Sequence, residues 1–293
     1  MIEVGDYNTL TVSRLARGGC FLDAGEEGEI YLSKKETPRN TKPEDSLRVF
    51  VYNESKDRLG ATTVDPIAKV GDFAPMVVTS VEDFGIFLEW GISKDLFVPR
   101  KHLPEKEKPH RGGAHPSSGR GEIQRGNIIV VYLTLDYEKK GVIGTTHLAS
   151  HFDRDTSPLS ENREVELIVY ALTRIGAQAV IDNRWDGLLY HGEIFESLRV
   201  GDRKKGYVKK VREDGLVDVS LQPQGFIPST GQARHDILEA LDHAGGFLPL
   251  HDKSDPAEIR SRLQMSKKLF KKTIGVLYKE GELSIEEEGI RKK

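Results

Sequence analysis

The feature that most constrains this chain is a repeat in its first half. Val4-Gly5-Asp6-Tyr7 recurs as Val70-Gly71-Asp72-Phe73, 66 residues later. The same offset places residues 19–23 on residues 85–89, with matching chemistry. A chain that repeats a unit of about 65 residues is expected to fold as a series of similar small domains.

The repeat continues past a predicted insertion. From residue 47 onward the offset becomes 83, so that residues 47–63 fall on residues 130–146. The additional residues lie near 104–124, where the Gly, Pro and Ser content predicts a surface loop. A third, more diverged copy at an offset of 91 from the second places Gly176 on Gly85.

Each copy is predicted to contain about five short strands. Runs such as residues 128–133 are rich in β-forming residues, and Gly and Asp mark the turns. In the second copy the expected strands are 73–82, 84–90, 95–99, 127–135 and 141–146. Five strands without a long amphipathic helix favour a small closed barrel, which has no exposed strand edges.

The pattern changes after Pro223. Apolar residues at helical spacing predict helices over 232–243, from Pro256 to about Leu263, and over 267–279. Residues 282–285 then alternate like a strand. Three helices followed by a short β wing predict a winged helix.

Several segments carry a family resemblance. Val70-Gly71-Asp72, residues 83–88 and residues 96–103 make the first two copies similar to ribosomal S1-type OB-fold domains, which bind RNA. Across roughly residues 1–290 the chain resembles the bacterial virulence factor B (CvfB/YitL) family. That resemblance implies RNA binding, regulation of virulence-gene expression and no catalytic activity.

The predicted fold class is therefore mainly β with a C-terminal α+β domain. We expect three tandem five-stranded OB-fold (S1-like) barrels followed by a winged-helix domain. The expected domains span residues 1–66, 67–150, 151–224 and 225–293.

Composition and charge narrow the function classes. The net charge of −3 argues against a generally basic nucleic-acid coat, so anion binding must come from local patches. The single Cys20 excludes an internal disulfide and a cysteine-based zinc site, and its position on a predicted strand places it in the core.

Residues 1–6 lack a secretory pattern, and no apolar run is long enough to span a membrane. We expect a cytoplasmic protein.

Enzyme and metal motifs are weak in this sequence. His147 and His151 have a helical metal-ligand spacing, but the adjacent Thr146 suggests a strand end and no His-Glu-x-x-His pattern is present. There is no phosphate-cradling Gly-x-x-x-x-Gly-Lys-Ser/Thr motif. We therefore expect no cofactor, no metal and no enzymatic activity.

Aromatic side chains are the candidates for stacking on bases. The S1 resemblance implies that the aromatic of the Gly-x-Phe segment faces the ligand, which falls on Phe87 and Phe21. The third copy has Gln178 there, which argues against stacking by that domain. The further candidates are Phe84, Phe97, Tyr31 and Tyr190. Strand parity leaves open whether Phe97 and Tyr31 face outward or into the core.

Clustered cations are the candidates for contacts with phosphate. Pairs follow the third strand of both clear copies, and further clusters lie in the third copy and on the last helix. The candidates are Lys34, Lys35, Arg100, Lys101, Lys204, Lys205, Lys209, Lys210, Arg212, Lys267, Lys268, Lys271 and Lys272. The four lysines of the last helix include no base-reading side chain, so they fit backbone contact better than sequence readout, or form a solvated lysine face.

The sequence thus predicts an RNA-binding regulator whose partner is single-stranded RNA. Two alternatives stay open. One is a transcription regulator whose winged helix binds duplex nucleic acid, although Glu286, Glu287 and Glu288 in the wing would repel phosphate. The other is a scaffold whose barrels bind protein.

Overall fold

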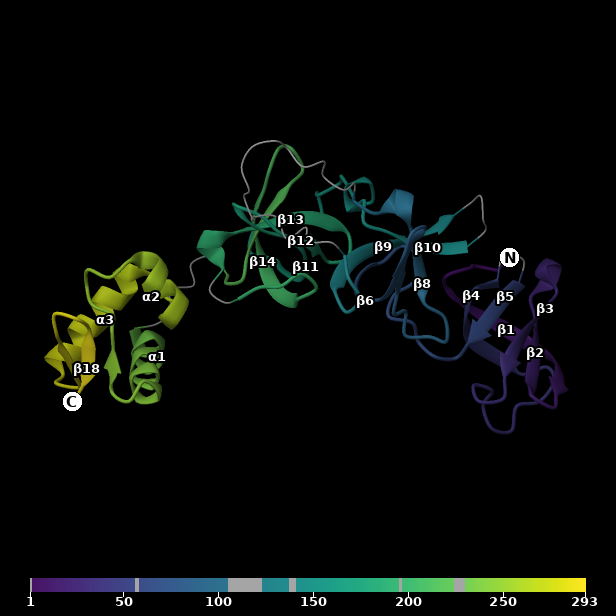
Figure 1. The fold of residues 1–293 in the computed structure, drawn as a ribbon, viewed down its shortest axis with the longest axis horizontal. Coiled ribbons are helices and arrows are strands. Elements are labelled where there is room, and N and C mark those ends of the chain that lie inside the picture. The colour runs from purple at the N-terminus through teal and green to yellow at the C-terminus, as the bar shows by residue number, and fades with distance from the viewer. Residues whose placement is uncertain (1, 56–57, 105–122, 137–140, 195–196, 224–229) are drawn as a thin grey trace.

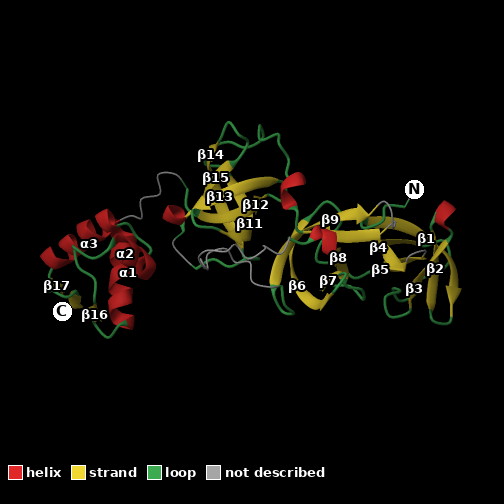
Figure 2. Ribbon diagram, turned by 45° about the horizontal axis from the view of Figure 1, so that its top comes forward, coloured by secondary structure: helices red, strands yellow, loops and turns green. Residues whose placement is uncertain are grey.

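The computed structural model describes residues 2–55, 58–104, 123–136, 141–194, 197–223 and 230–293. Four units follow one another in chain order along the long axis of the molecule (Figure 1). Strands dominate the first three units, and the α-helices gather in the last (Figure 2). The predicted fold class is confirmed.

The first unit is a five-stranded antiparallel sheet. Its strands are β1 (Tyr7–Ala16), β2 (Gly19–Asp23), β3 (Glu29–Ser33), β4 (Ser46–Ser55) and β5 (Arg58–Thr62). The order is β3-β2-β1-β4-β5, and the edge strands β3 and β5 contact each other. Alternation along β2 buries Cys20 and Leu22 and turns Phe21 outward, so Cys20 is a core residue as predicted.

The second and third units are closed barrels. The second contains β6 (Phe73–Glu82), β7 (Gly85–Leu88), β8 (Leu96–Pro99), β9 (Ile128–Asp136) and β10 (Gly141–Thr145). The third contains β11 (Glu164–Leu172), β12 (Gly176–Ile181), β13 (Trp185–Tyr190), β14 (Arg203–Val211) and β15 (Val217–Ser220). In each, a parallel pair of strands closes the barrel, β8 with β10 and β13 with β15. The first, second and third units are called barrels 1, 2 and 3 below.

One glycine position confirms that the third copy belongs to the same repeat. Gly19, Gly85 and Gly176 begin the second strand of the three barrels with φ of +155°, +158° and +157°. A Cβ there would lie 2.0 to 2.3 Å from a carbonyl oxygen of the neighbouring strand. Only glycine tolerates both the backbone angle and the close approach.

Barrels 1 and 2 share an apolar joint. The buried Trp90 of barrel 2 packs edge-on against Phe50 of barrel 1, with ring centroids 5.5 Å apart, and also against Tyr52. Its indole N–H donates to the carbonyl oxygen of Ala68, 2.8 Å away. The two barrels therefore meet through a continuous core rather than a free linker.

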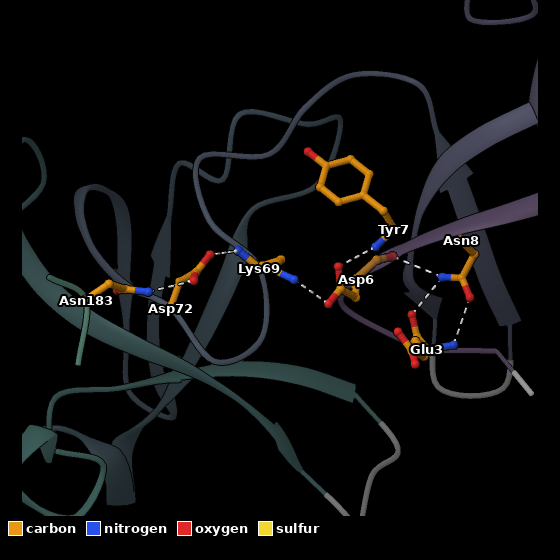
Figure 3. Close-up of polar contacts among 7 residues, drawn as sticks. All are labelled: Glu3, Asp6, Tyr7, Asn8, Lys69, Asp72 and Asn183. Carbon is orange, nitrogen blue, oxygen red and sulfur yellow. Dashed lines mark hydrogen bonds and ion pairs between the residues drawn. The ribbon is translucent and has the colours of Figure 1, made fainter. Parts of the chain in front are cut away.

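Polar contacts cross the same region (Figure 3). Lys69 Nζ contacts Asp6 Oδ2 of barrel 1 at 2.6 Å, and Lys69 N–H donates to Asp72 Oδ2 at 3.0 Å. Asp72 Oδ1 in turn accepts from Asn183 Nδ2 of barrel 3 at 2.8 Å. The aspartates of the repeated Val-Gly-Asp segment thus stand at both joints.

Barrels 2 and 3 are joined by aromatic packing. Phe73 of β6 stacks on Phe152 with centroids 4.9 Å apart and interplanar angle 10°. Tyr132 and Tyr170 flank this pair from β9 and β11. Asn183 Oδ1 also accepts from the N–H of Phe73, 2.6 Å away. The three barrels are therefore in direct contact.

The last unit has the predicted winged-helix elements. They are α1 (Thr230–His243), β16 (Phe247–Leu248), α2 (Pro256–Leu263), α3 (Lys267–Lys279), β17 (Leu283–Ile285) and β18 (Ile290–Lys292). Side chains of Asp255 and Ser266 accept from N–H groups in the first turns of α2 and α3, as expected of N-caps. The first helix begins two residues before the predicted start. Within the described residues, no helix is long and apolar enough to cross a membrane.

Candidate nucleic-acid interface

All three barrels contain a hydroxyl–carboxylate pair at the same place in the fold. A β-bulge falls near the middle of the first strand in all three barrels. The bulged residue carries a hydroxyl group that donates to a carboxylate near the start of the third strand. The pairs are Ser13–Glu29 at 2.7 Å, Thr79–Asp95 at 2.7 Å and Tyr170–Asp186 at 2.8 Å. The bulge re-aims the side chain out of the pleat, and so gives all three faces a common frame.

Barrel 2 presents a cluster of three phenylalanines on this frame. Phe87 of β7 and Phe97 of β8 lie opposite each other, with centroids 5.1 Å apart. Phe84, in the turn before β7, lies 5.8 Å from Phe97 and 6.2 Å from Phe87. Phe84 is 60% exposed, and the other two rings are half-buried. Strand parity therefore turns Phe97 outward, where neighbouring rings partly cover it.

Two cations lie next to the phenylalanine cluster. Arg100 and Lys101 begin the short 3-10 helix η2 (Arg100–His102), and both side chains are exposed. The N–H of Arg100 donates to the carbonyl oxygen of Phe84 at 2.9 Å, which ties this basic turn to the cluster. Burial, together with Lys101 and His147, lowers the pKa of His102, so the positive charge here comes from Arg100 and Lys101.

Barrel 1 has the equivalent aromatic pair, but one ring is covered. Phe21 and Tyr31 lie opposite each other with centroids 5.3 Å apart, and Tyr31 is 39% exposed. The guanidinium of Arg14 lies over Phe21, 3.7 Å from the ring centroid. Glu29 holds Arg14 by an ion pair of 2.8 Å. The hydrogen bonds from Arg14 and Ser13 lower the pKa of Glu29.

Arg14 was not among the predicted site residues. Its counterpart in barrel 2, at the offset of 66, is Ser80, which is too short to reach across a ring. An arginine at this position of one copy and a serine in the other is the sequence difference that could have indicated the covered ring. The cations of barrel 1 that were predicted, Lys34 and Lys35, are both exposed after β3.

Barrel 3 lacks the aromatic pair. Gln178 and Leu188 lie opposite each other where barrel 2 has Phe87 and Phe97. Tyr190 is 37% exposed, and its hydroxyl group accepts from Arg212 Nη2 at 2.7 Å. The ring is thus tied to a cation on the same face.

The predicted basic cluster of barrel 3 is mostly paired with carboxylates. Lys205 lies 3.0 Å from Glu164, and Lys209 lies 2.5 Å from Glu193. Arg212 forms an ion pair with Asp218. Lys204 is half-buried, and Lys210 is exposed. Paired cations keep less of their charge for phosphate, because the carboxylate already neutralises it.

The lysines of α3 divide into two stripes. Lys267 donates to the carbonyl oxygen of Ser254 at 2.8 Å, and Lys271 lies 3.7 Å from Asp252. Lys268 and Lys272 are exposed and form no ion pair within the described part of the chain. Only this second stripe is free for phosphate contact.

One of the two histidines with metal-ligand spacing packs against a tyrosine ring. His151 stacks on Tyr132 with ring centroids 4.0 Å apart, and burial lowers its pKa. Among the described residues, no group of three or more His, Cys, Asp and Glu side chains is placed to hold a metal ion. The loop insertion predicted near 104–124 lies mostly outside the described residues.

Two family models match separate parts of the chain. The model of the S1 domain matches residues 4–64, and that of the CvfB-like winged helix domain matches residues 235–291. A solved multidomain protein with nucleic acid binding domains from Streptococcus pneumoniae aligns with 24% identity and a TM-score of 0.48, covering 99% of this chain and 98% of that one.

Two curated relatives align over nearly the full chain. The conserved virulence factor B of Staphylococcus aureus (strain USA300) is 26% identical over 294 residues, which cover 97% of this chain and 92% of that protein. The uncharacterized protein YitL of Bacillus subtilis (strain 168) is 31% identical over 286 residues, which cover 95% of this chain and 90% of that protein. The chain therefore belongs to the virulence factor B (CvfB/YitL) family.

Proposed function

We propose that this protein is a cytoplasmic regulator of gene expression that binds single-stranded RNA through the outer faces of its barrels. The observation that carries the proposal is the cluster of Phe84, Phe87 and Phe97 beside exposed Arg100 and Lys101. Exposed rings stack on unpaired bases, and neighbouring cations neutralise phosphates. The name of the staphylococcal relatives, conserved virulence factor B, supports a regulatory role.

The other candidate residues contribute in this proposal according to their pairing. Lys34, Lys35 and Lys210 are exposed and supply phosphate contacts. Tyr31 and Tyr190 offer partly exposed rings. The cations already paired with carboxylates contribute less. We also propose the domain boundaries 1–66, 67–150, 151–224 and 225–293 for dissecting these contributions.

Fluorescence anisotropy tests the proposal. Labelled single-stranded RNA and duplex DNA of equal length are each titrated with the full chain at several salt concentrations. We expect tighter binding of the RNA, with an affinity that falls as salt rises because each neutralised phosphate releases counterions. RNA binding that is absent, or that does not respond to salt, would refute the proposal and point instead to a protein-binding scaffold.

Exposed Lys268 and Lys272 favour a second candidate function, contact of α3 with a duplex. The double variant Lys268→Gln, Lys272→Gln separates the two. Under the second candidate this variant loses binding to duplex DNA. Under the first, binding of single-stranded RNA by the barrels mostly survives.

A further inference from the structure

The face of barrel 3 contains a hollow of about 320 Å³ where barrel 2 carries its rings. Such a volume is within the range of about 300–1,000 Å³ that small-molecule pockets occupy. Ile175, Leu188 and Leu216 supply apolar walls. Gln178 and Leu188, which replace the phenylalanine pair of barrel 2, both line the hollow, so that no ring of this pair covers the two strands here.

Two polar groups line this hollow. The amide of Gln178 is half-buried and has no hydrogen-bond partner among the described residues. Arg212 is held in place by Asp218 and by the hydroxyl group of Tyr190. Both of these hydrogen bonds use Nη2, which leaves the Nε and Nη1 donors without a partner in the described structure. The arrangement is a fixed cation beside an unpaired amide.

The chemistry of these groups suits a nucleotide. A primary amide offers one donor and one acceptor side by side, and glutamine pairs in this way with the N6 and N7 atoms of adenine. A guanidinium offers only donors and therefore suits a phosphate. Apolar walls suit the two faces of a base.

We propose that this hollow is a subsite for a single adenosine nucleotide of the bound RNA. Gln178 reads the edge of the base. The unpartnered Nε and Nη1 groups of Arg212 donate hydrogen bonds to its phosphate, a contact that Asp218 weakens because it offsets part of the charge. This inference rests on the proposed function and extends it. Barrel 2 would stack on any base without preference, whereas barrel 3 would recognise one kind of base.

The test uses the full chain and labelled 12-mers of oligouridine that carry one central substitution by A, G or C. We expect the A-containing strand to bind about tenfold more tightly than oligouridine itself, in line with the discrimination of one bidentate pair. Gln178→Leu should remove this preference, so that the variant binds the A-containing strand and oligouridine equally. Gln124→Leu makes the same chemical change at an exposed glutamine of barrel 2 and should keep the preference.

The possible failures are distinguishable. Equal affinity for all four strands, or a preference that persists in a folded Gln178→Leu protein, overturns the adenosine subsite alone. A preference for G or C overturns the assignment of adenine. Binding of none of the strands by the folded wild-type chain overturns the proposed function together with the subsite. A thermal melt of each variant shows that it is folded.

Discussion

Barrels 1 and 2 place an aromatic pair at the same position, yet only one pair is open. Phe21 faces Tyr31 at 5.3 Å, and Phe87 faces Phe97 at 5.1 Å. The guanidinium of Arg14, 3.7 Å from the Phe21 ring centroid, occupies the space that a stacked base would take. One residue on the neighbouring strand, Arg14 in place of serine, therefore decides whether the same scaffold offers a platform.

The largest expected effect comes from removing the open pair. The double variant Phe87→Ala, Phe97→Ala should weaken binding of single-stranded RNA by about 1–3 kcal/mol for each base that no longer stacks. The matched variant Phe21→Ala, Tyr31→Ala should cost less, because Arg14 already covers one of its rings. Fluorescence anisotropy measures both affinities. An equal loss of RNA affinity in the two double variants would contradict the conclusion that the aromatic pair of barrel 1 is covered and that of barrel 2 is open.

Two substitutions should give the face of barrel 2 the covered ring of barrel 1. Ser80→Arg combined with Asp95→Glu reproduces the ion pair that holds the guanidinium over the ring. We expect RNA affinity to fall by about 1 kcal/mol, roughly fivefold, although the variant gains a positive charge. Ser80→Lys adds the charge without a planar guanidinium and should not weaken binding. An affinity that rises in the Arg variant would contradict the covering role.

The third prediction concerns the joint that holds the two faces together. Burial alone would raise the pKa of Asp6, but hydrogen bonds from Lys69 and from the N–H of Tyr7 lower it overall. The hydrogen bond to Asp6 raises the pKa of Lys69 despite partial burial. The ion pair is partly exposed, so Asp6→Asn should cost at most about 1 kcal/mol of unfolding free energy near neutral pH.

The sign of its pH dependence follows from these two shifts. The lowered pKa of Asp6 contributes stability above its unfolded value of about 3.9, and this contribution is lost as pH falls through the folded pKa. The raised pKa of Lys69 contributes stability below about 10.4, which is lost as pH rises through its folded value. Urea unfolding of wild type and Asp6→Asn should therefore differ at pH 7 and converge in acid. A constant difference would contradict the assignment.

The smallest expected effect is the reverse conversion of barrel 1. Arg14→Ser should uncover Phe21, but the loss of a positive charge offsets part of the gain, which leaves a few tenths of a kcal/mol. A double-mutant cycle isolates this effect. Phe21→Ala should weaken RNA binding more in the Arg14→Ser background than in wild type. The same loss in both backgrounds would mean that the guanidinium does not block stacking.

Local patterns predicted much of the fold. The strand over 73–82 and the helix over 267–279 coincide with β6 and α3, because alternation, helical spacing and capping residues act over a few neighbours. The sequence aligned Gly176 with Gly85 but did not establish the diverged third copy. The backbone angle that Gly19, Gly85 and Gly176 share in the structure establishes it, because that angle excludes other residues.

Contacts between residues far apart in the chain could not be predicted from the sequence. Whether Lys209 is free depends on Glu193, which comes from a different part of barrel 3. The cover on Phe21 depends on Glu29 of β3, fifteen residues from Arg14 of β1. The register of β2 with both strands brings these two side chains together. The contact of Trp90 with Phe50 joins two copies of the repeat. Single-residue patterns identify which side chains bear charge or rings, but packing decides which of them remain available.

Under the proposed function, the stack of Phe73 on Phe152 determines which lengths of RNA bind most tightly. Domains on a flexible tether gain avidity gradually, because the effective concentration of the second site varies smoothly with reach. Barrels 2 and 3 are instead packed against each other, so the spacing between their faces is set by the protein. An oligonucleotide too short to span that spacing gains no affinity from the second face, and one just long enough gains the full contribution. Affinity plotted against strand length should therefore rise in a step, at the number of nucleotides that spans the two faces.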